Sequence, residues 1–126
     1  MRSKGLWRST LREGDLKAVI CEAPIDALSY AKLLHDKNDR TRYFAIGGQV
    51  SRFQWLLIDG LINKYSSKKM DICLAFDNDP AGKNYIQQFE ERYSGVLLTV
   101  DLPPQKGQDW NDVLQKKQSM GMKVTA

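Results

Sequence analysis

Short apolar runs alternate with longer amphipathic segments along most of the chain, and this order restricts the fold more than any other feature. Four apolar runs have the length and composition of buried strands: 17–21, 43–46, 70–76 and 95–100. Helical periodicity follows each of them, at about 24–36, 52–64, 80–93 and 109–117. Repeated strand–helix units with apolar strands predict an α/β fold, a Rossmann-like four-stranded parallel sheet with helices on both faces.

Length and composition agree with one globular domain. The chain has 126 residues, 42% of them hydrophobic and 27% charged, which argues against a disordered chain. The apolar runs are too short to cross a bilayer, and the first residues lack the apolar run of a secretory signal. We therefore expect a cytoplasmic protein without a membrane partner. Two cysteines, Cys21 and Cys73, are too few for a disulfide scaffold or a zinc site of their own.

Charge is unevenly distributed along the chain. Residues 1–20 contain five basic and two acidic side chains, and residues 115–126 contain three basic and none acidic. The net charge is only +4, so the middle of the chain is slightly acidic. Basic ends around an acidic centre suit a protein that contacts a polyanion with its ends and a cation at its centre. Solubility tails explain the same pattern.

Acidic and glycine residues follow the predicted strands. Glu22 comes after the first strand, Gly47 and Gly48 after the second, Asp77 and Asp79 after the third, and Asp109 after the fourth. Ligands of parallel α/β sheets bind beyond the carboxyl ends of the strands, where these residues would converge. Clustered carboxylates repel one another unless a cation lies among them, and Mg²⁺ prefers oxygen ligands. The pattern predicts a divalent metal site.

A simpler interpretation of the Asp77-x-Asp79 turn stays open. Aspartate is common at turns and at the N-cap of helices, and Pro80 follows as a favoured first helical residue. On this interpretation the two aspartates are only turn and N-cap residues. On either interpretation, Gly82 would let backbone or ligand approach closely.

Four segments, in this order, resemble the motifs of Toprim domains, the fold shared by topoisomerases and bacterial-type primases. They are Ile20–Ser29 with its glutamate, Ala45–Gly48 with its glycine turn, Ala75–Lys83 with Asp-x-Asp, and Leu102–Asp112 with Leu-Pro and Gly-x-Asp. The set covers residues 18–112. The "EAPIDALSYA" run and Asp-Trp-Asn-Asp resemble most the primase-like Toprim domains of plasmid and mobile-element replication or mobilisation proteins.

The resemblance implies roles for individual residues. Glu22 would act as general acid/base, and Asp77 and Asp79 would bind Mg²⁺, with Mn²⁺ as a substitute. Asp26 and Asp109 would be outer or second-metal ligands. The expected phosphate or nucleic-acid contacts are Gly47, Gly48, Lys83 and Lys106.

The sequence departs from the family pattern in two respects. Gln108 stands where the last motif usually has lysine, and Lys106 is the nearby replacement. A primase zinc module and a basic primase subdomain are missing from this sequence. We therefore expect a module of a larger protein: a basic segment over 1–16 that ends a preceding region, a Toprim domain over 17–118, and a flexible tail over 119–126.

The function expected from the sequence is Mg²⁺-dependent, primase-like nucleotidyl transfer on nucleic-acid phosphodiesters. Its partners would be DNA or RNA, nucleotides, and other domains such as a helicase or relaxase. Two alternatives stay open: a metal-dependent DNA nuclease of the same fold, and a non-catalytic scaffold that binds DNA or a protein. A phosphatase with Asp77 as nucleophile fits less well, because its Asp-x-Asp usually follows the first strand.

Overall fold

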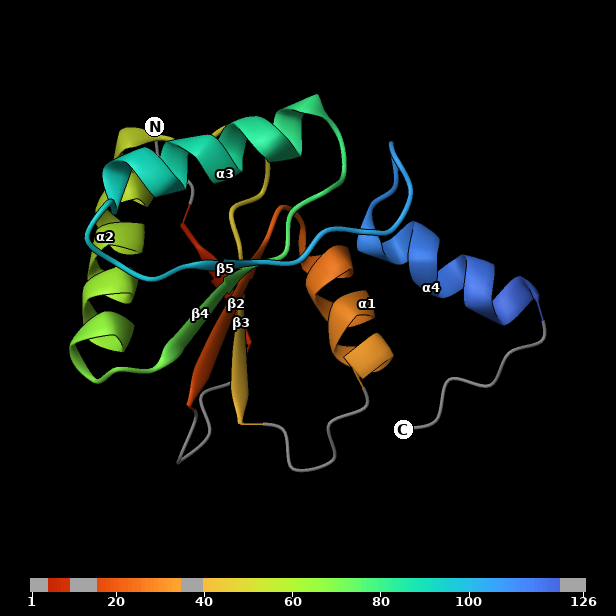
Figure 1. The fold of residues 1–126 in the computed structure, drawn as a ribbon, viewed down its shortest axis with the longest axis horizontal. Coiled ribbons are helices and arrows are strands. Elements are labelled where there is room, and N and C mark those ends of the chain that lie inside the picture. Colours follow the sequence, from red (N-terminus) through yellow and green to blue (C-terminus); the bar gives the residue numbers. More distant parts are fainter. Residues whose placement is uncertain (1–4, 10–15, 35–39, 121–126) are drawn as a thin grey trace.

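The structure, a computed structural model, describes residues 5–9, 16–34 and 40–120, and it confirms the α/β fold (Figure 1). The elements of these residues are β1 (Trp7–Arg8), β2 (Lys17–Cys21), α1 (Pro24–Leu34), β3 (Thr41–Ala45), α2 (Arg52–Ser67), β4 (Asp71–Leu74), α3 (Pro80–Arg92), β5 (Thr99–Val100) and α4 (Trp110–Ser119). No helix in the described ranges is long and apolar enough to cross a membrane.

The strands form one sheet in the order β1-β3-β2-β4-β5. The four strands β2 to β5 are parallel, and β1 pairs antiparallel with β3. Among the described residues the sheet thus has five strands, and the prediction of four was wrong in number. The missed strand contains only Trp7 and Arg8, which is too short to show an alternating pattern in the sequence.

Helices cover both faces of the sheet, as predicted. Along β2, Ala18 and Ile20 face a core built with α2 and α3, while Val19 and Cys21 face a core built with α1 and α4. Figure 1 shows these two helix pairs on opposite sides of the strands. Cys21 and Cys73 are buried free thiols and act as small apolar core residues.

The largest difference in element bounds lies at the last strand. The apolar run 95–100 predicts a strand of that length, but only Thr99 and Val100 pair with β4. Leu97 is 88% exposed, so the apolar composition of this run does not reflect burial. The helix predicted over 24–36 is described to Leu34, and its last two residues lie outside the described ranges. Most of the segments expected at 1–16 and 119–126 lie outside them too.

Hydrogen bonds that continue beyond the strands align the carboxyl ends of β2, β3 and β4. The backbone N–H of Ala75 donates to the carbonyl of Ile20, and the N–H of Ile46 donates to the carbonyl of Cys21. The loops that follow these strands therefore start from one edge of the sheet. That edge carries the predicted site.

Candidate metal centre

Three carboxylates from distant parts of the chain meet at the carboxyl edge of the sheet. Glu22, Asp77 and Asp79 each place a carboxylate oxygen within 4.8 Å of the other two. Glu22 directly follows β2, and the two aspartates lie on the turn between β4 and α3. The predicted convergence of these strand-end residues is confirmed.

Asp79 has two structural roles at once. It is the N-cap of α3, and its Oδ1 accepts a hydrogen bond of 2.7 Å from the backbone N–H of Gly82. The helix-start interpretation of this residue is therefore correct, and so is its expected position in the acidic cluster. The cap fixes the carboxylate in place, because its rotamer is held by the first turn of the helix.

Gly82 allows α3 to lie directly against the turn that carries Asp77. A Cβ atom at this position would be 2.1 Å from the carbonyl oxygen of Asp77, far inside van der Waals contact. The close approach expected for Gly82 is an approach of backbone to backbone. Only glycine permits it without moving the turn.

Mutual repulsion and burial favour a bound proton in this cluster. Burial raises the pKa of Asp77 to about 8, together with a hydrogen bond to Glu22 and the charges of Glu22, Asp79 and Asp109. Burial also raises the pKa of Glu22, against the opposing effect of hydrogen bonds from Asp77. A cation would act against both pKa shifts, because it stabilises the charged forms of the two carboxyl groups.

The donor set fits a hard divalent cation. Oδ1 of Asp77 is buried, and none of the described residues offers it a hydrogen bond. A buried carboxylate oxygen without a partner is costly unless an ion or a water satisfies it. Three carboxylates offer the oxygen ligands that Mg²⁺ and Mn²⁺ prefer, and leave room for metal-bound waters.

Asp26 and Asp109 lie beside this cluster, but neither belongs to the group of three among the described residues. Asp26, on α1, is buried, and its Oδ1 accepts from the backbone N–H of Asn111 at 3.2 Å. Burial raises the pKa of Asp26 to about 6, with contributions from the charges of Asp109 and Asp77. Asp109 is the N-cap of α4, where it forms a capping box with Asp112.

Gly47 and Gly48 form the turn after β3, in the position predicted for them. Both have positive φ angles, 67° and 86°, which glycine adopts without strain. The N–H of Gly47 donates to the carbonyl of Glu22, so this turn lies next to the acidic cluster. The hydroxyl of Tyr85 donates to the carbonyl of Gly48 at 2.8 Å and ties the turn to α3.

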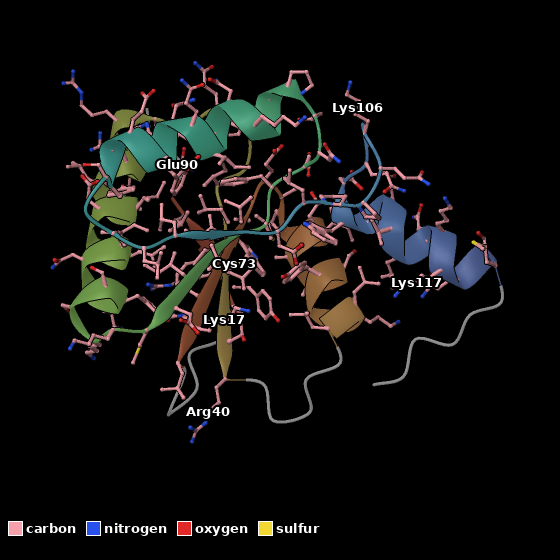
Figure 2. All side chains as sticks on the ribbon, viewed as in Figure 1. Lys17, Arg40, Cys73, Glu90, Lys106 and Lys117 are labelled. Carbon is pink, nitrogen blue, oxygen red and sulfur yellow. The ribbon has the colours of Figure 1, made fainter. Side chains whose placement is uncertain are left out.

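Two lysines predicted to contact phosphate lie beside the acidic cluster. Lys83 of α3 and Lys106 of the β5–α4 loop line one cavity of about 350 Å³, which Asp79 also lines. Figure 2 labels Lys106 near the tip of this loop. The fold thus brings two cations from different segments to the edge of the carboxylate cluster.

Asn78 is a site residue that sequence reasoning missed. Its N–H donates to the carbonyl of Gln108, its carbonyl accepts from Gly107, and its side-chain amide donates to the carbonyl of Pro103. These bonds fasten the Lys106 loop to the turn between the two aspartates. Asparagine is favoured in turns for such side-chain bonds to backbone, but the sequence does not identify the distant acceptor.

Trp110 packs inside the domain and anchors α4. Its Nε1–H donates to the carbonyl of Ala75 at 3.1 Å, and its ring contacts Tyr30 edge-on with centroids 4.7 Å apart. Trp110 therefore has a packing role. Because the side chain is buried, its ring is not available to stack on a base.

The chain thus combines a mostly parallel α/β sheet with an acidic triad at the carboxyl edge of that sheet. The sequence model of the Toprim-like family matches residues 19–114, and the chain belongs to this family. Among curated proteins, no sequence is significantly similar.

One similar solved structure is the RNA polymerase domain of primase DnaG from Mycobacterium tuberculosis, with a TM-score of 0.57 and 18% identity. The similarity covers 83% of this chain and 33% of that one, so the chain spans about a third of the primase structure. At this identity the similarity shows a common fold.

Proposed function

We propose that this chain is a Mg²⁺-dependent, primase-like nucleotidyl-transfer module that acts on nucleic-acid phosphodiesters. The observation that carries the proposal is the triad of Glu22, Asp77 and Asp79, with a buried and unpartnered oxygen on Asp77. Membership of the Toprim-like family and the fold shared with a primase domain support it.

Asp77 and Asp79 would hold the ion, and Glu22 would handle the proton of an attacking or leaving hydroxyl. The raised pKa of Glu22, caused first by burial, brings this carboxyl closer to neutrality and suits it to proton transfer. A bound Mg²⁺ would neutralise negative charge on the phosphate oxygens. Asp26 and Asp109, which lie beside the triad, would be outer or second-metal ligands.

Cationic and backbone groups around the triad would orient the substrate. Lys83 and Lys106 would contact phosphates in the cavity that they share with Asp79. Gly47 and Gly48 present a turn without side chains beside Glu22, where a phosphate can approach the backbone closely. Lysine contacts of this kind make binding weaken as salt rises.

The partners that we propose follow from this chemistry: a DNA or RNA template, nucleotides, and further domains of a larger replication or mobilisation protein. A helicase or a relaxase would be such a domain. The primase structure with the same fold is about three times as long as the matched region, which supports the idea of a module within a larger assembly.

The experiment offers the protein two substrates with Mg²⁺: a single-stranded template with nucleotides, and a supercoiled plasmid. New oligonucleotides would support the primase-like function, whereas nicked plasmid would identify a nuclease. If neither product forms, the chain is a non-catalytic scaffold, and this result would contradict the proposal. Glu22→Gln is the matched variant, because it keeps the size of the side chain and an oxygen acceptor for the N–H of Asp77. Undiminished synthesis by this variant would reject Glu22 as the proton-transfer group.

A further inference from the structure

A second cavity of about 350 Å³ lies between α2 and the β1–β3 edge of the sheet. Its apolar wall includes Leu6, Leu57 and Leu61, and its cationic groups are Arg8, Arg42 and Lys64. It shares no lining residue with the cavity beside Asp79 or with the acidic triad. A volume of this size holds a small organic ligand.

The fold places three cations around this cavity from three different elements. Arg8 of β1 pairs with Phe44 of β3, so that their side chains share the sheet face below α2. Arg42 lies two residues before Phe44 on the same strand and therefore on the same face. Lys64 is in the last turn of α2.

Arg42 is held in place before any ligand arrives. It is only 8% exposed, its guanidinium lies 5.5 Å from the centroid of the Phe44 ring, and its Nε–H donates to the carbonyl of Ser9. A fixed guanidinium costs little further entropy when it binds an anion, and its fork of N–H groups matches a phosphate or carboxylate.

Carboxylates do not neutralise these cations in the part of the chain that the structure describes. The described lining of the cavity contains no acidic residue. The acidic residue of α2, Asp59, instead forms an ion pair with Arg92, at 2.8 Å, and accepts from the hydroxyl of Tyr93. As far as the described residues go, the cavity thus combines three cations that no lining carboxylate faces with an apolar wall.

Gly60 keeps the cavity open at a cost to helix stability. It lies in the interior of α2, where glycine is less favourable than alanine. A Cβ built on Gly60 meets no atom within 4 Å, so close packing does not require glycine here. The absent side chain leaves space in the cavity wall.

We propose that this cavity is a second binding site for a nucleotide unit, with the phosphate against Arg8, Arg42 and Lys64 and the nucleoside against the leucine wall. A ligand of this kind matches both the charge and the apolar surface, whereas a bare anion would leave the wall unused. The choice of a nucleotide among phosphate esters rests on the proposed function. The unit can come from a free mononucleotide or from a single strand.

Binding is measured in EDTA, so that any contribution of divalent metal at the triad is removed. The probes are AMP, inorganic phosphate and a fluorescein-labelled oligothymidylate, with calorimetry for the small ligands and fluorescence anisotropy for the strand. AMP binding tighter than phosphate is expected. If the site binds free nucleotides, the oligonucleotide should bind no more tightly than AMP. If the site binds a single strand, the oligonucleotide should bind more tightly than AMP. The logarithm of its binding constant should then fall with the logarithm of the salt concentration, with a slope of about 0.7 per phosphate contact.

Two variants address the cavity without disturbing the core. Lys64→Glu and Gly60→Glu each place a carboxylate at its wall, and the second also replaces a helix-destabilising residue. We expect both to weaken binding about tenfold, the size of one lost charge-assisted contact. Gly60→Gln is the neutral control. Lys117→Glu makes the same charge change in the last turn of α4, away from α2 in Figure 2.

Equal weakening by Lys64→Glu and Lys117→Glu would show a general effect of net charge and overturn the proposal. AMP no tighter than inorganic phosphate, or no binding by any probe, would overturn it as well. Asp77→Asn/Asp79→Asn must leave binding in EDTA undiminished, since these residues lie at the other site. If the cavity does not bind nucleotide, the metal chemistry proposed for the triad still stands. If that chemistry fails, binding of AMP in EDTA still tests the cavity by itself.

Discussion

The backbone N–H of Asp77 donates to Oε1 of Glu22 at 3.3 Å and joins residues 55 positions apart in the sequence. The contact spans the ends of neighbouring parallel strands, β2 and β4. It brings two acidic side chains together at a half-buried position, where their repulsion has to be relieved by a proton or a cation. The stability of the fold should therefore respond to pH and to divalent ions through this pair.

Stability in EDTA should fall as pH rises through the range in which Asp77 titrates. Burial and Glu22 raise the pKa of Asp77 from its ordinary 3.8 to about 8 in the folded protein. The proton therefore stabilises the fold fully below pH 3.8, and this contribution is lost as pH rises toward and through 8. Urea unfolding at pH 5.5, 7.0 and 8.5 measures it. A pH dependence identical to that of Asp77→Asn would contradict this prediction.

Asp77→Asn should stabilise the metal-free protein at pH 8.5 by about 1–2 kcal/mol, a value discounted for the partial exposure of the cluster. The amide keeps the shape of the side chain and removes the repulsion with Glu22 and Asp79. Asp71→Asn is the matched control, because Asp71 is exposed at the opposite end of β4. The measurement is the denaturant midpoint of each variant in EDTA. Equal shifts of the two midpoints from the wild-type value would contradict the prediction.

Gly82→Ala should destabilise the protein by about 3 kcal/mol or more and weaken any metal binding at the triad. The new Cβ would overlap the carbonyl of Asp77, so α3 or the turn has to move. Gly60→Ala is the control, since its Cβ meets open space and should stabilise by up to about 1 kcal/mol. Thermal unfolding of both variants checks this, and equal effects would contradict it.

Asn78→Ala should loosen the Lys106 loop at a cost of about 1 kcal/mol, the net value of one hydrogen bond. The variant removes the side-chain bond to Pro103 and leaves the two backbone bonds of residue 78. Hydrogen exchange at the amide of Gly107 should become faster. Gln105→Ala, in the same loop, is the control, because Gln105 is exposed and its hydrogen bonds to Gln108 use its backbone N–H and carbonyl. Unchanged exchange in Asn78→Ala would refute this positioning role.

The fold and the acidic triad could be predicted because each depends on a rule with local signals. Apolar runs followed by amphipathic segments indicate parallel strands, and parallel strands bring their carboxyl ends to one edge. Glu22, Asp77 and Asp79 stand directly after such runs, so their convergence follows from the topology.

The remaining features depend on contacts that no local pattern encodes. Trp7 and Arg8 form a strand only because the edge of β3 is available to them. The hydrogen bonds of Asn78 to the Lys106 loop join segments about 25 to 30 residues apart. The hydrogen bond between Asp26 and Asn111 joins residues that are 85 positions apart. Leu97 shows the opposite failure, since an apolar residue predicted in a strand is exposed.

Binding of Mn²⁺, followed by electron paramagnetic resonance, tests directly whether the three carboxylates form a metal site. The wild-type protein should bind the ion saturably, and Mg²⁺ should compete for it. Asp77→Asn/Asp79→Asn should bind at least about tenfold more weakly, because two of three carboxylates are lost, while Asp71→Asn should match wild type. Equal affinity of wild type and the double variant would contradict the metal site on which the proposed function rests.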